Sequence, residues 1–461
     1  MNSLYATSFL TDIFSTVRNK SKKIIKQVRM KTLTGVSITL LLMLVINFTA
    51  KSQDTIYVRR MLDSLTSPSM NGRGYVNEGN KTAALFLNNE YSKMKLQKFR
   101  DTYMQPYFKS INTFPGKMDV RFNKTTLKPD IDYIVALSSP AIKGKYKIVK
   151  LDSTNFNSQE DIDKYLKKNY KNKFILIDKR GIKDTNVTKF IQSNNRFNKF
   201  NAKGYIYVSD KLVWGASDGI IVNKFVKITI TTKLLSLIDP KKLTIETEAE
   251  YKTDYNLYNL VGYVKGKSNP DSFYVFTAHY DHIGRMGKDT YFPGANDNAS
   301  GTSMVLDLAN YYSTPEHQPE YSIAFLIFSG EECGLWGSEY YSSHPEFPLS
   351  KIKFLINLDM VGTGSDGITM VNATTFKEQY KKMNEINKKN NYLKTIAERG
   401  ESCNSDHCPF YQKGVPAIFI FTMGSEDSEY HNIFDTSAKL PLTKYTSLFK
   451  LLVDYIKNYE L

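Results

Sequence analysis

Five side chains of the kinds that bind metal ions occur between residues 279 and 431. They are His279, Asp297, Glu332, Asp359 and His431, and Glu331 directly precedes the third. A centre that holds two divalent ions needs roughly five nitrogen or oxygen ligands, one of them a bridging carboxylate, and a separate carboxylate that moves protons. The set therefore predicts metal-dependent hydrolysis, with one carboxylate left over to act as the base.

Strongly apolar segments precede most of these residues along the chain. The segments 259–264, 273–277, 322–328, 354–358 and 417–421 are predicted to be strands. Their near-continuous apolarity is typical of a sheet covered on both faces, so the sequence predicts an α/β fold with a mixed central sheet and helices on both faces. The helices are expected at 301–312, after Leu335 and at about 375–398. Open α/β sheets place their active sites at the carboxyl ends of the strands, which is where the candidates lie.

The first two candidates are His279 and Asp297. His279 has a neighbouring carboxylate that could orient it, and Asp297 could serve as a helix cap instead of a ligand. In the segment 277–282 the strand period of two puts His279 and Asp281 on the same side, so Asp281 is expected to accept the second ring N–H of His279 and to fix its tautomer. Asp297 ends a loop and opens an apolar helix, where a carboxylate can also serve as the N-cap. Asn296 or Asn298 could take the cap instead, which would leave Asp297 to bridge two ions.

The adjacent carboxylates of Glu331 and Glu332 follow the most apolar predicted strand. They leave the backbone in different directions, so one can bind a metal while the other faces the attacking water. A metal-held carboxylate is a poor proton acceptor, whereas a neighbouring one can take the proton from water and pass it to the leaving amine. The alternative is that the helix dipole favours two acids in a first turn.

The last two candidates are Asp359 and His431, and the sequence context favours a functional role for the first alone. Asp359 ends the apolar run 354–358, and a charge in such a place rarely stays buried unless it is paired or bound to a metal. His431 lies in a polar loop after the final predicted strand, and that setting alone does not favour a functional role.

The chain falls into regions of different composition. With 461 residues, 41% of them hydrophobic, it is long enough for one large domain with an insertion or for two domains. Residues 53–119 are predicted to be mainly helical and to belong with 251–461, the region that carries every candidate ligand. Residues 120–250 hold short β-rich runs separated by turns rich in Lys and Asn, which is typical of an inserted accessory β-domain.

The first 52 residues have the three regions of an export signal. A basic run from Lys20 to Lys31 precedes the apolar stretch 36–48, and small and polar residues follow it. The apolar stretch is about 13 residues long, whereas a membrane span needs roughly 20. Export through a signal peptide, without a stable membrane span afterwards, is therefore expected, and translation could start at Met1 or at Met30.

Neither the net charge nor the cysteine count indicates a special class of protein. The formal charge is +16, of which residues 1–34 supply +6, and the other lysines include runs in polar stretches without interleaved aromatic residues. We interpret them as a solvated basic surface, so no nucleic-acid partner is expected. Three cysteines are too few for a disulfide scaffold, although Cys403 and Cys408 could close a small ring and leave Cys333 as the odd thiol.

Taken together, residues 255–440 resemble peptidase family M28, in particular its co-catalytic di-zinc aminopeptidases. The matching motifs are the segments 278–282, 294–301, 330–338, 357–362, 405–410 and 430–431. Residues 61–94 look like the helical lead-in of this family. Residues 120–250 lie where some members carry a protease-associated insertion.

The resemblance implies two Zn²⁺ ions and a role for each candidate. Asp297 would bridge the ions, with His279 and Asp359 completing one site and Glu332 and His431 the other. Glu331 would be the general base. The stretch 405–407 would form a polar wall that faces the substrate, with His407 as an oxyanion donor. A Cys403–Cys408 disulfide would lie close by.

The expected reaction is the release of N-terminal residues from a peptide or protein, provided that acidic groups near the metals hold the free amine. The candidates for this contact are Glu426, Asp427 and Glu429. A carboxypeptidase or dipeptidase on the same fold stays open, because loops around the site decide between them. A one-zinc glutaminyl cyclase would tolerate the loss of the second metal's ligands, and all of them are present here. From a different class, the chain could be a non-catalytic surface-binding protein in which residues 120–250 do the work.

Overall fold

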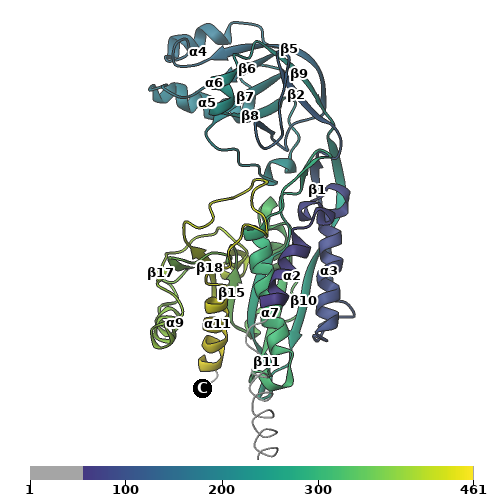
Figure 1. Ribbon diagram of the computed structural model, residues 1–461, viewed down its shortest axis with the longest axis vertical. Helices are drawn as coiled ribbons and strands as arrows, with labels where there is room; N and C mark the ends of the chain where they lie inside the picture. Colours follow the sequence, from purple (N-terminus) through teal and green to yellow (C-terminus); the bar gives the residue numbers. More distant parts are fainter. Residues whose placement is uncertain (1–54, 460–461) are drawn as a thin grey trace, which may run out of the picture. The chain divides into compact units, whose positions relative to one another are not determined.

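A computed structural model describes residues 55–459 of the chain. The predicted export signal, residues 1–52, lies outside these residues. The described part contains two eight-stranded sheets, which we call the central sheet and the second sheet (Figure 1). No helix between residues 55 and 459 is both long enough and apolar enough to cross a membrane.

The central sheet has the strand order β1-β10-β14-β11-β15-β18-β16-β17. Neighbours among β14, β11, β15 and β18 are parallel, β10 is antiparallel to both β1 and β14, and β16 is antiparallel to β18 but parallel to β17. This confirms the predicted mixed sheet. Its strands are β1 (Met104–Thr113), β10 (Glu250–Val264), β11 (Asn269–His279), β14 (Tyr321–Phe328), β15 (Ile352–Leu358), β16 (Gly367–Val371), β17 (Ile396–Glu398) and β18 (Ala417–Met423).

The parallel strands in the middle of this sheet end at nearly the same level. His279, the last residue of β11, pairs with Phe328, the last residue of β14. On the other side of β11, Thr277 pairs with Asn357, one residue before β15 ends. Because the carboxyl ends of parallel strands meet at one edge of a sheet, the segments that follow β11, β14, β15 and β18 are brought together there.

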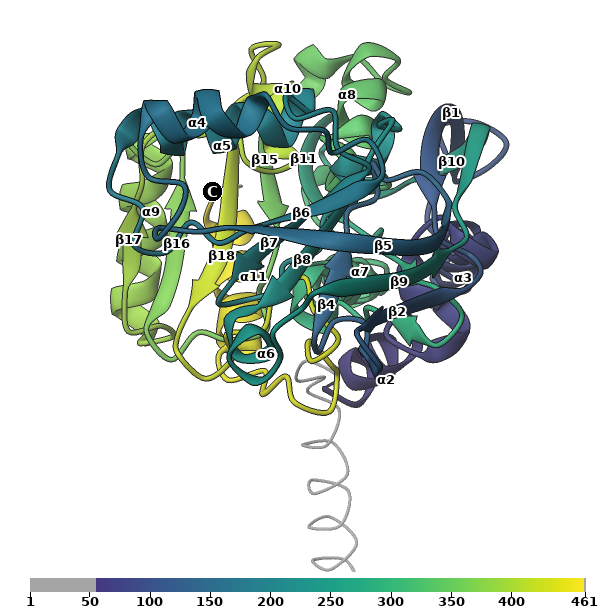
Figure 2. The ribbon, with the colours of Figure 1, turned by 90° about the horizontal axis from the view of Figure 1, so that it is seen from above.

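Helices cover both faces of the central sheet, as the continuous apolar strands predicted. Figure 2 shows α7 and α11 on one side of strands β11, β15 and β18, and α8 and α10 on the other. The apolar cluster on the first face also takes in α2, α3 and α9. The bounds are α2 (Thr55–Leu65), α3 (Gly79–Lys93), α7 (Gly301–Tyr312), α8 (Trp336–Ser343), α9 (Lys377–Asn390), α10 (His407–Tyr411) and α11 (Tyr445–Tyr459).

Two segments differ from the sequence-based expectation. The helix expected at about 375–398 ends at Asn390, and Asn391 adopts the left-handed conformation with a φ of 54° that often closes a helix. Residues 396–398 then form the edge strand β17. In the region 53–119, which was expected to be mainly helical, β1 extends over ten residues and pairs with β10.

The second sheet has the strand order β3-β2-β9-β5-β6-β7-β8-β4. We call residues 118–247, which supply all of its strands, the accessory region. It also contains helices that its Lys- and Asn-rich sequence did not indicate. The elements are β2 (Met118–Phe122), β3 (Thr125–Thr126), β4 (Tyr133–Val135), β5 (Ile142–Leu151), β6 (Lys173–Ile177), β7 (Gly204–Ser209), β8 (Val226–Thr231), β9 (Lys242–Thr247), α4 (Gln159–Leu166), α5 (Thr185–Phe197) and α6 (Thr232–Leu237).

The two faces of the second sheet pack against different partners. Ile175 of β6 belongs to an apolar cluster with Val187 of α5, inside the accessory region. Its neighbour Phe174 points to the opposite face, because side chains alternate along a strand. There it joins a cluster that also includes Phe292 and Trp336, which lie outside the accessory region. The accessory region therefore shares an apolar core with the segments around the central sheet.

Candidate metal centre

All five predicted ligands lie at the carboxyl edge of the central sheet. His279 is the last residue of β11, and Asp359 directly follows β15. Glu332 belongs to the short turn Glu331–Cys333 just after β14, and His431 lies in the loop that follows β18. Asp297 lies in the segment Ala295–Ser300, which leads into α7. Residues up to 152 positions apart in sequence thus meet because four parallel strands end together.

Their ligand atoms form two groups, and within each group all atoms lie within 4.8 Å of one another. The first group is His279, Glu331 and Asp359, and we call it the first half of the centre. The second is His282, Asp297, Glu332 and His431. We call His282, Glu332 and His431 the second half, because Asp297 reaches both groups.

Asp297 has the geometry of a bridging ligand. Its Oδ1 lies 3.5 Å from Nε2 of His279, and its Oδ2 lies 3.1 Å from Nε2 of His431. The competing role as a helix cap is filled by a neighbour, since Oδ1 of Asn298 accepts the Gly301 N–H at 2.8 Å. One carboxylate therefore offers an oxygen to each half, and its role as a bridge between two ions stays a prediction.

The first half is held by a chain of hydrogen bonds between adjacent strands. Nε2 of His279 lies 3.4 Å from Oδ1 of Asp359. The other oxygen of Asp359 accepts a hydrogen bond of 2.8 Å from the Ser405 hydroxyl. Ser405 in turn accepts from the amide of Asn357, whose oxygen accepts from the Thr277 hydroxyl. Asp359 is thereby oriented by residues of β15, β11 and the segment before α10.

The second half includes a histidine that the sequence analysis did not assign. Oε2 of Glu332 lies 3.0 Å from Nε2 of His431, and its Oε1 lies 2.7 Å from Nδ1 of His282. His282 is fully buried. It therefore fits a residue that orients Glu332. Its position in the same motif as His279 was the available signal, but strand alternation does not place it beside His279.

Asp281 organises more of the centre than the sequence predicted. Nδ1 of His279 lies 3.2 Å from the backbone oxygen of Asp281 and 3.7 Å from its carboxylate. The same carboxylate accepts the backbone N–H of Glu331 at 3.2 Å and of Glu332 at 3.4 Å. Asp281 thus connects His279 with the turn that carries both glutamates, although the atom nearest the His279 ring nitrogen is its backbone oxygen and not the predicted carboxylate.

The two adjacent glutamates point into different halves. Glu332 contacts His431 and His282, whereas Glu331 lies 3.9 Å from Nε2 of His279. The side chain of Glu331 is 16% exposed and that of Glu332 is 4% exposed. Glu331 is the more accessible carboxylate, which suits a group that meets water and substrate.

Buried carboxylates and imidazoles strongly perturb one another here. Burial raises the pKa of Glu331 well above its usual value. Burial also opposes the charged form of Glu332, but His431 and His282 hold its pKa well below the usual value. For His431, burial alone would lower the pKa, yet Glu332 and Asp297 raise it to about 11. Protonated imidazole is therefore the counter-charge that these carboxylates find within the protein.

This donor set fits divalent cations. Within residues 55–459, histidines are the only ion-pair partners of four carboxylates, those of Asp297, Glu331, Glu332 and Asp359. Two adjoining groups of imidazole nitrogens and carboxylate oxygens are what zinc binds in catalytic sites. A cation would replace the protons on the imidazoles and remove the repulsion among the buried acids.

The sequence of this part of the chain has a known counterpart. Residues 259–456 match the model of the protein family described as Peptidase family M28. These residues belong to peptidase family M28. Over 210 residues, the chain is 33% identical to the aminopeptidase YwaD of Bacillus subtilis (strain 168), and this alignment covers 41% of this chain and 42% of YwaD. The chain thus matches about two fifths of the length of that relative.

Solved structures share the fold well beyond residues 259–456, which we call the M28 domain. A zinc aminopeptidase from Bacillus subtilis, BSAP, superposes with a TM-score of 0.64 at 19% identity, over 88% of this chain and 95% of that one. The aminopeptidase from Aneurinibacillus sp. strain AM-1 gives a TM-score of 0.60 at 20% identity, over 89% of this chain and 94% of that one. At such identities the likeness concerns the fold, which it confirms.

Two further residues fix the backbone around Asp297 in the M28 domain, and the sequence analysis missed both. Arg73 is fully buried and donates to backbone carbonyls, among them those of Tyr280, Gly294 and Asp297. Asp435 accepts the backbone N–H of Asn296 at 2.8 Å and of Asp297 at 3.1 Å. Arg73 lies within residues 61–94, which the resemblance marked as a helical lead-in without giving Arg73 a role.

The predicted oxyanion donor, His407, is the first residue of α10, and the predicted disulfide joins this helix to the segment before it. Cys403 and Cys408 are bonded to each other. His407 is fully buried, belongs to neither group of ligand atoms, and has its Nε2 2.8 Å from the carbonyl oxygen of Ser402. Burial lowers its pKa to about 4, so the ring is neutral at neutral pH. Its contact with a substrate stays a prediction.

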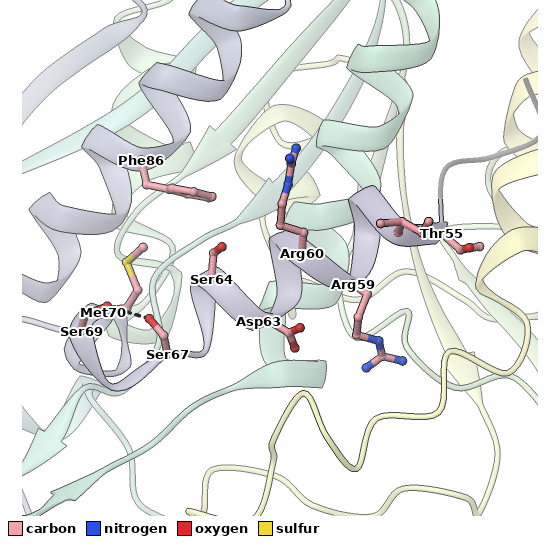
Figure 3. Close-up of a pocket in the computed structure, with 10 residues that line it drawn as sticks. Thr55, Arg59, Arg60, Asp63, Ser64, Ser67, Ser69, Met70 and Phe86 are labelled. Atoms are coloured by element: carbon pink, nitrogen blue, oxygen red, sulfur yellow. Dashed lines mark hydrogen bonds between the residues drawn. The ribbon is translucent and has the colours of Figure 1, made fainter.

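A cavity of about 800 Å³ lies along α2, away from the metal centre. Figure 3 shows Arg60 and Asp63 extending from this helix on different sides, and Phe86 of α3 facing it. Arg59 donates to the backbone oxygens of Ser437 and Leu440. None of the predicted ligands lines this cavity, and it offers a single carboxylate. We therefore place the chemistry at the edge of the central sheet.

Proposed function

We propose that the protein is a di-zinc aminopeptidase that releases N-terminal residues from peptides or proteins. The observation that carries the proposal is the position of Asp297, whose two oxygens face His279 on one side and His431 on the other. His279 and Asp359 would hold one ion, Glu332 and His431 the other, and Asp297 both. When bound there, the ions would supply the Lewis-acid chemistry that activates water and polarises a carbonyl group.

Glu331 is the general base in this proposal. Its carboxylate belongs to the first half, beside His279 and Asp359, and it is the more exposed of the two glutamates. It takes a proton from the attacking water and delivers it to the nitrogen of the leaving amine. Asp281 supports this role because it holds the Glu331 N–H and also lies against His279. Asp281 thus contacts the proposed base through its carboxylate and His279 through its backbone oxygen.

The aminopeptidase specificity is supported by the name of the relative YwaD and by acidic residues in the loop after β18. Glu426 is tied to Ser365 by two hydrogen bonds, and Glu429 accepts from Asn432. One oxygen of Asp427 is buried and lacks a hydrogen-bond partner within residues 55–459. Each of the three predicted anchors therefore keeps acceptor positions that its internal hydrogen bonds do not use, as contact with a substrate ammonium group requires.

The substitution Glu331→Gln tests the mechanism. The variant should bind two zinc ions like the wild type, whereas turnover should fall by roughly 10²–10⁴-fold because the proton acceptor is gone. Glu339→Gln is the matched control, since Glu339 is exposed on α8 in the same part of the chain. Zinc content and initial rates on aminoacyl fluorogenic substrates measure both effects. Turnover near that of the control would contradict the assignment of the base.

The same substrates test the specificity. Activity on free aminoacyl derivatives should disappear with a chelator and return with zinc, and N-acetylated derivatives should be poor substrates. Equal cleavage of blocked and free peptides would contradict the aminopeptidase proposal and leave a peptidase of another specificity. A protein that binds ligands but neither zinc nor substrate would favour a binding function of the accessory region.

Export is part of this proposal and rests on the sequence of residues 1–52 alone. The basic run followed by a short apolar stretch supports a signal peptide. Expression of the full chain followed by fractionation and N-terminal sequencing measures it directly. Recovery of the unprocessed chain in the cytoplasm would contradict it.

A further inference from the structure

The second ring nitrogen of His431 is held by the accessory region. Nδ1 of His431 lies 2.8 Å from the carbonyl oxygen of Trp214, which lies between β7 and β8. In return, the Trp214 N–H donates to the carbonyl oxygen of His431 at 3.3 Å. A ligand histidine usually donates its other N–H to such an acceptor, which fixes its tautomer and ring direction. For His279 that partner is Asp281, two residues away, whereas for His431 it is 217 residues away.

Trp214 is itself firmly fixed, so its carbonyl is a defined partner. The side chain is 1% exposed, and its Nε1–H donates to the carbonyl oxygen of Val135 at 2.8 Å. Its ring stacks on Phe292, with ring centres 4.8 Å apart and planes 24° from parallel. Phe292 precedes the segment that carries Asp297. The side chain thereby joins the second sheet to the approach to the bridging ligand.

Two other parts of the accessory region touch the second half of the centre. Oδ2 of Asp130, which precedes β4, accepts the backbone N–H of Ile433 at 2.8 Å. The short turn Ser217–Ile220 packs against the turn Glu331–Cys333, which carries Glu332. Both ligand-bearing segments of the second half therefore contact the accessory region. Asp359, in the first half, is oriented by Ser405 and Asn357 of the M28 domain.

We propose that the accessory region positions the second metal site, with Trp214 as the positioning residue that holds His431 through its backbone carbonyl. This inference rests on the proposed di-zinc function. Disturbing the packing of Trp214 then weakens zinc binding at the second half and leaves the first half unchanged. The accessory region is accordingly a structural part of the metal centre, in addition to any contact that it makes with substrates.

The test compares Trp214→Ala with Phe156→Ala. The first change removes the hydrogen bond to Val135 and the stacking on Phe292, so the segment that carries the carbonyl shifts. Phe156 is fully buried in the other cluster of the accessory region, away from His431, and controls for general loss of stability. Zinc affinity is measured by competition with chelators of graded strength, and coordination is monitored by the absorption of Co²⁺-substituted protein.

We expect Trp214→Ala to weaken the binding of one of the two zinc ions by roughly 10–100-fold, which is the usual effect of losing a hydrogen-bond partner of a metal ligand. The Co²⁺ spectrum of that site should change as well. Phe156→Ala should retain both affinities. Two milder variants cover the case in which Trp214→Ala does not fold. Trp214→Phe keeps an aromatic ring on Phe292, and Asp130→Ala removes the acceptor of Ile433. Each variant should weaken the binding of the same zinc ion by a smaller factor.

The outcomes separate this inference from the proposed function. A wild type that binds fewer than two zinc ions contradicts the di-zinc proposal, whatever the variants do. If the wild type binds two ions and folded Trp214 variants bind both with unchanged affinity, the positioning role is wrong while the di-zinc function stands. Equal weakening of both ions, or equal weakening by Phe156→Ala, would also overturn it, since either result indicates general destabilisation.

Discussion

The two halves of the metal centre are built in different ways. In the first half, His279 ends β11 and Asp359 directly follows the adjacent parallel strand β15, and residues of the same M28 domain orient them. In the second half, Glu332 and His431 lie on a turn and a long loop, and His431 is oriented by Trp214 of the accessory region. A ligand at a strand end inherits its position from the sheet. A candidate ligand on a loop needs added contacts, and here the accessory region supplies one of them.

Asp297→Ala should have the largest effect, because this carboxylate serves both halves. Both ions should bind more than about 100-fold more weakly, which exceeds the usual loss for an outer partner. Hydrolysis should become undetectable. Asp271→Ala, at an exposed position of β11, is the control. Zinc titration of both variants measures the effect, and a variant that loses a single ion would show that Asp297 belongs to one half.

Asp435→Asn should change how stability depends on pH. Burial raises the pKa of Asp435 from 3.8 to about 7, so its contribution to stability is complete below pH 4 and is lost as the pH rises through 7. The variant lacks this loss, so its unfolding free energy relative to wild type should rise between pH 4 and pH 8, by up to roughly 4 kcal/mol. Urea unfolding of chelator-treated proteins measures the difference. A constant difference across this range would contradict the raised pKa.

His282→Phe should affect the second half alone. It removes the ring nitrogen that lies 2.7 Å from Oε1 of Glu332 while keeping a planar ring in the buried position. We expect the second ion to bind roughly 10–100-fold more weakly. Competition with chelators, applied to this variant and to Trp214→Ala, shows whether both changes weaken the binding of the same zinc ion. Weakening of the first ion instead would break the distinction between the halves.

Ser405→Ala should have the smallest effect, and on the first half. It removes the 2.8 Å hydrogen bond to Asp359 but leaves this ligand at the end of β15. The loss of one hydrogen bond to a charged group corresponds to about 1.5 kcal/mol, or roughly tenfold in affinity for the first ion. Ser402→Ala, in the same segment, is the control. An effect on the second ion would contradict the separation.

The strands around the metal centre could be predicted from sequence because their apolar runs are continuous and bounded by polar loops. The accessory region was harder to interpret. Val187 and Ile191 are the buried apolar positions of α5, in a helix that is otherwise largely polar, so it resembled a loop. The three residues of β17 were predicted to be the end of a helix, because their types are compatible with one. The left-handed conformation of Asn391, which ends the helix earlier, is visible only in the structure. Short elements depend on their neighbours more than on their own residues.

The mixed α/β fold, and the candidate ligands that it brings to one edge of the central sheet, could be predicted from the sequence. They rest on local patterns, namely apolar strands with acids and histidines at their ends, which a chain displays without being folded. The tertiary structure alone revealed the roles of His282, Arg73 and Asp435, and the contact of His431 with Trp214. Those contacts join segments far apart in the chain, and all but the one between His282 and Glu332 use backbone carbonyls or N–H groups. Every residue carries such groups, so only folding decides which of them meet.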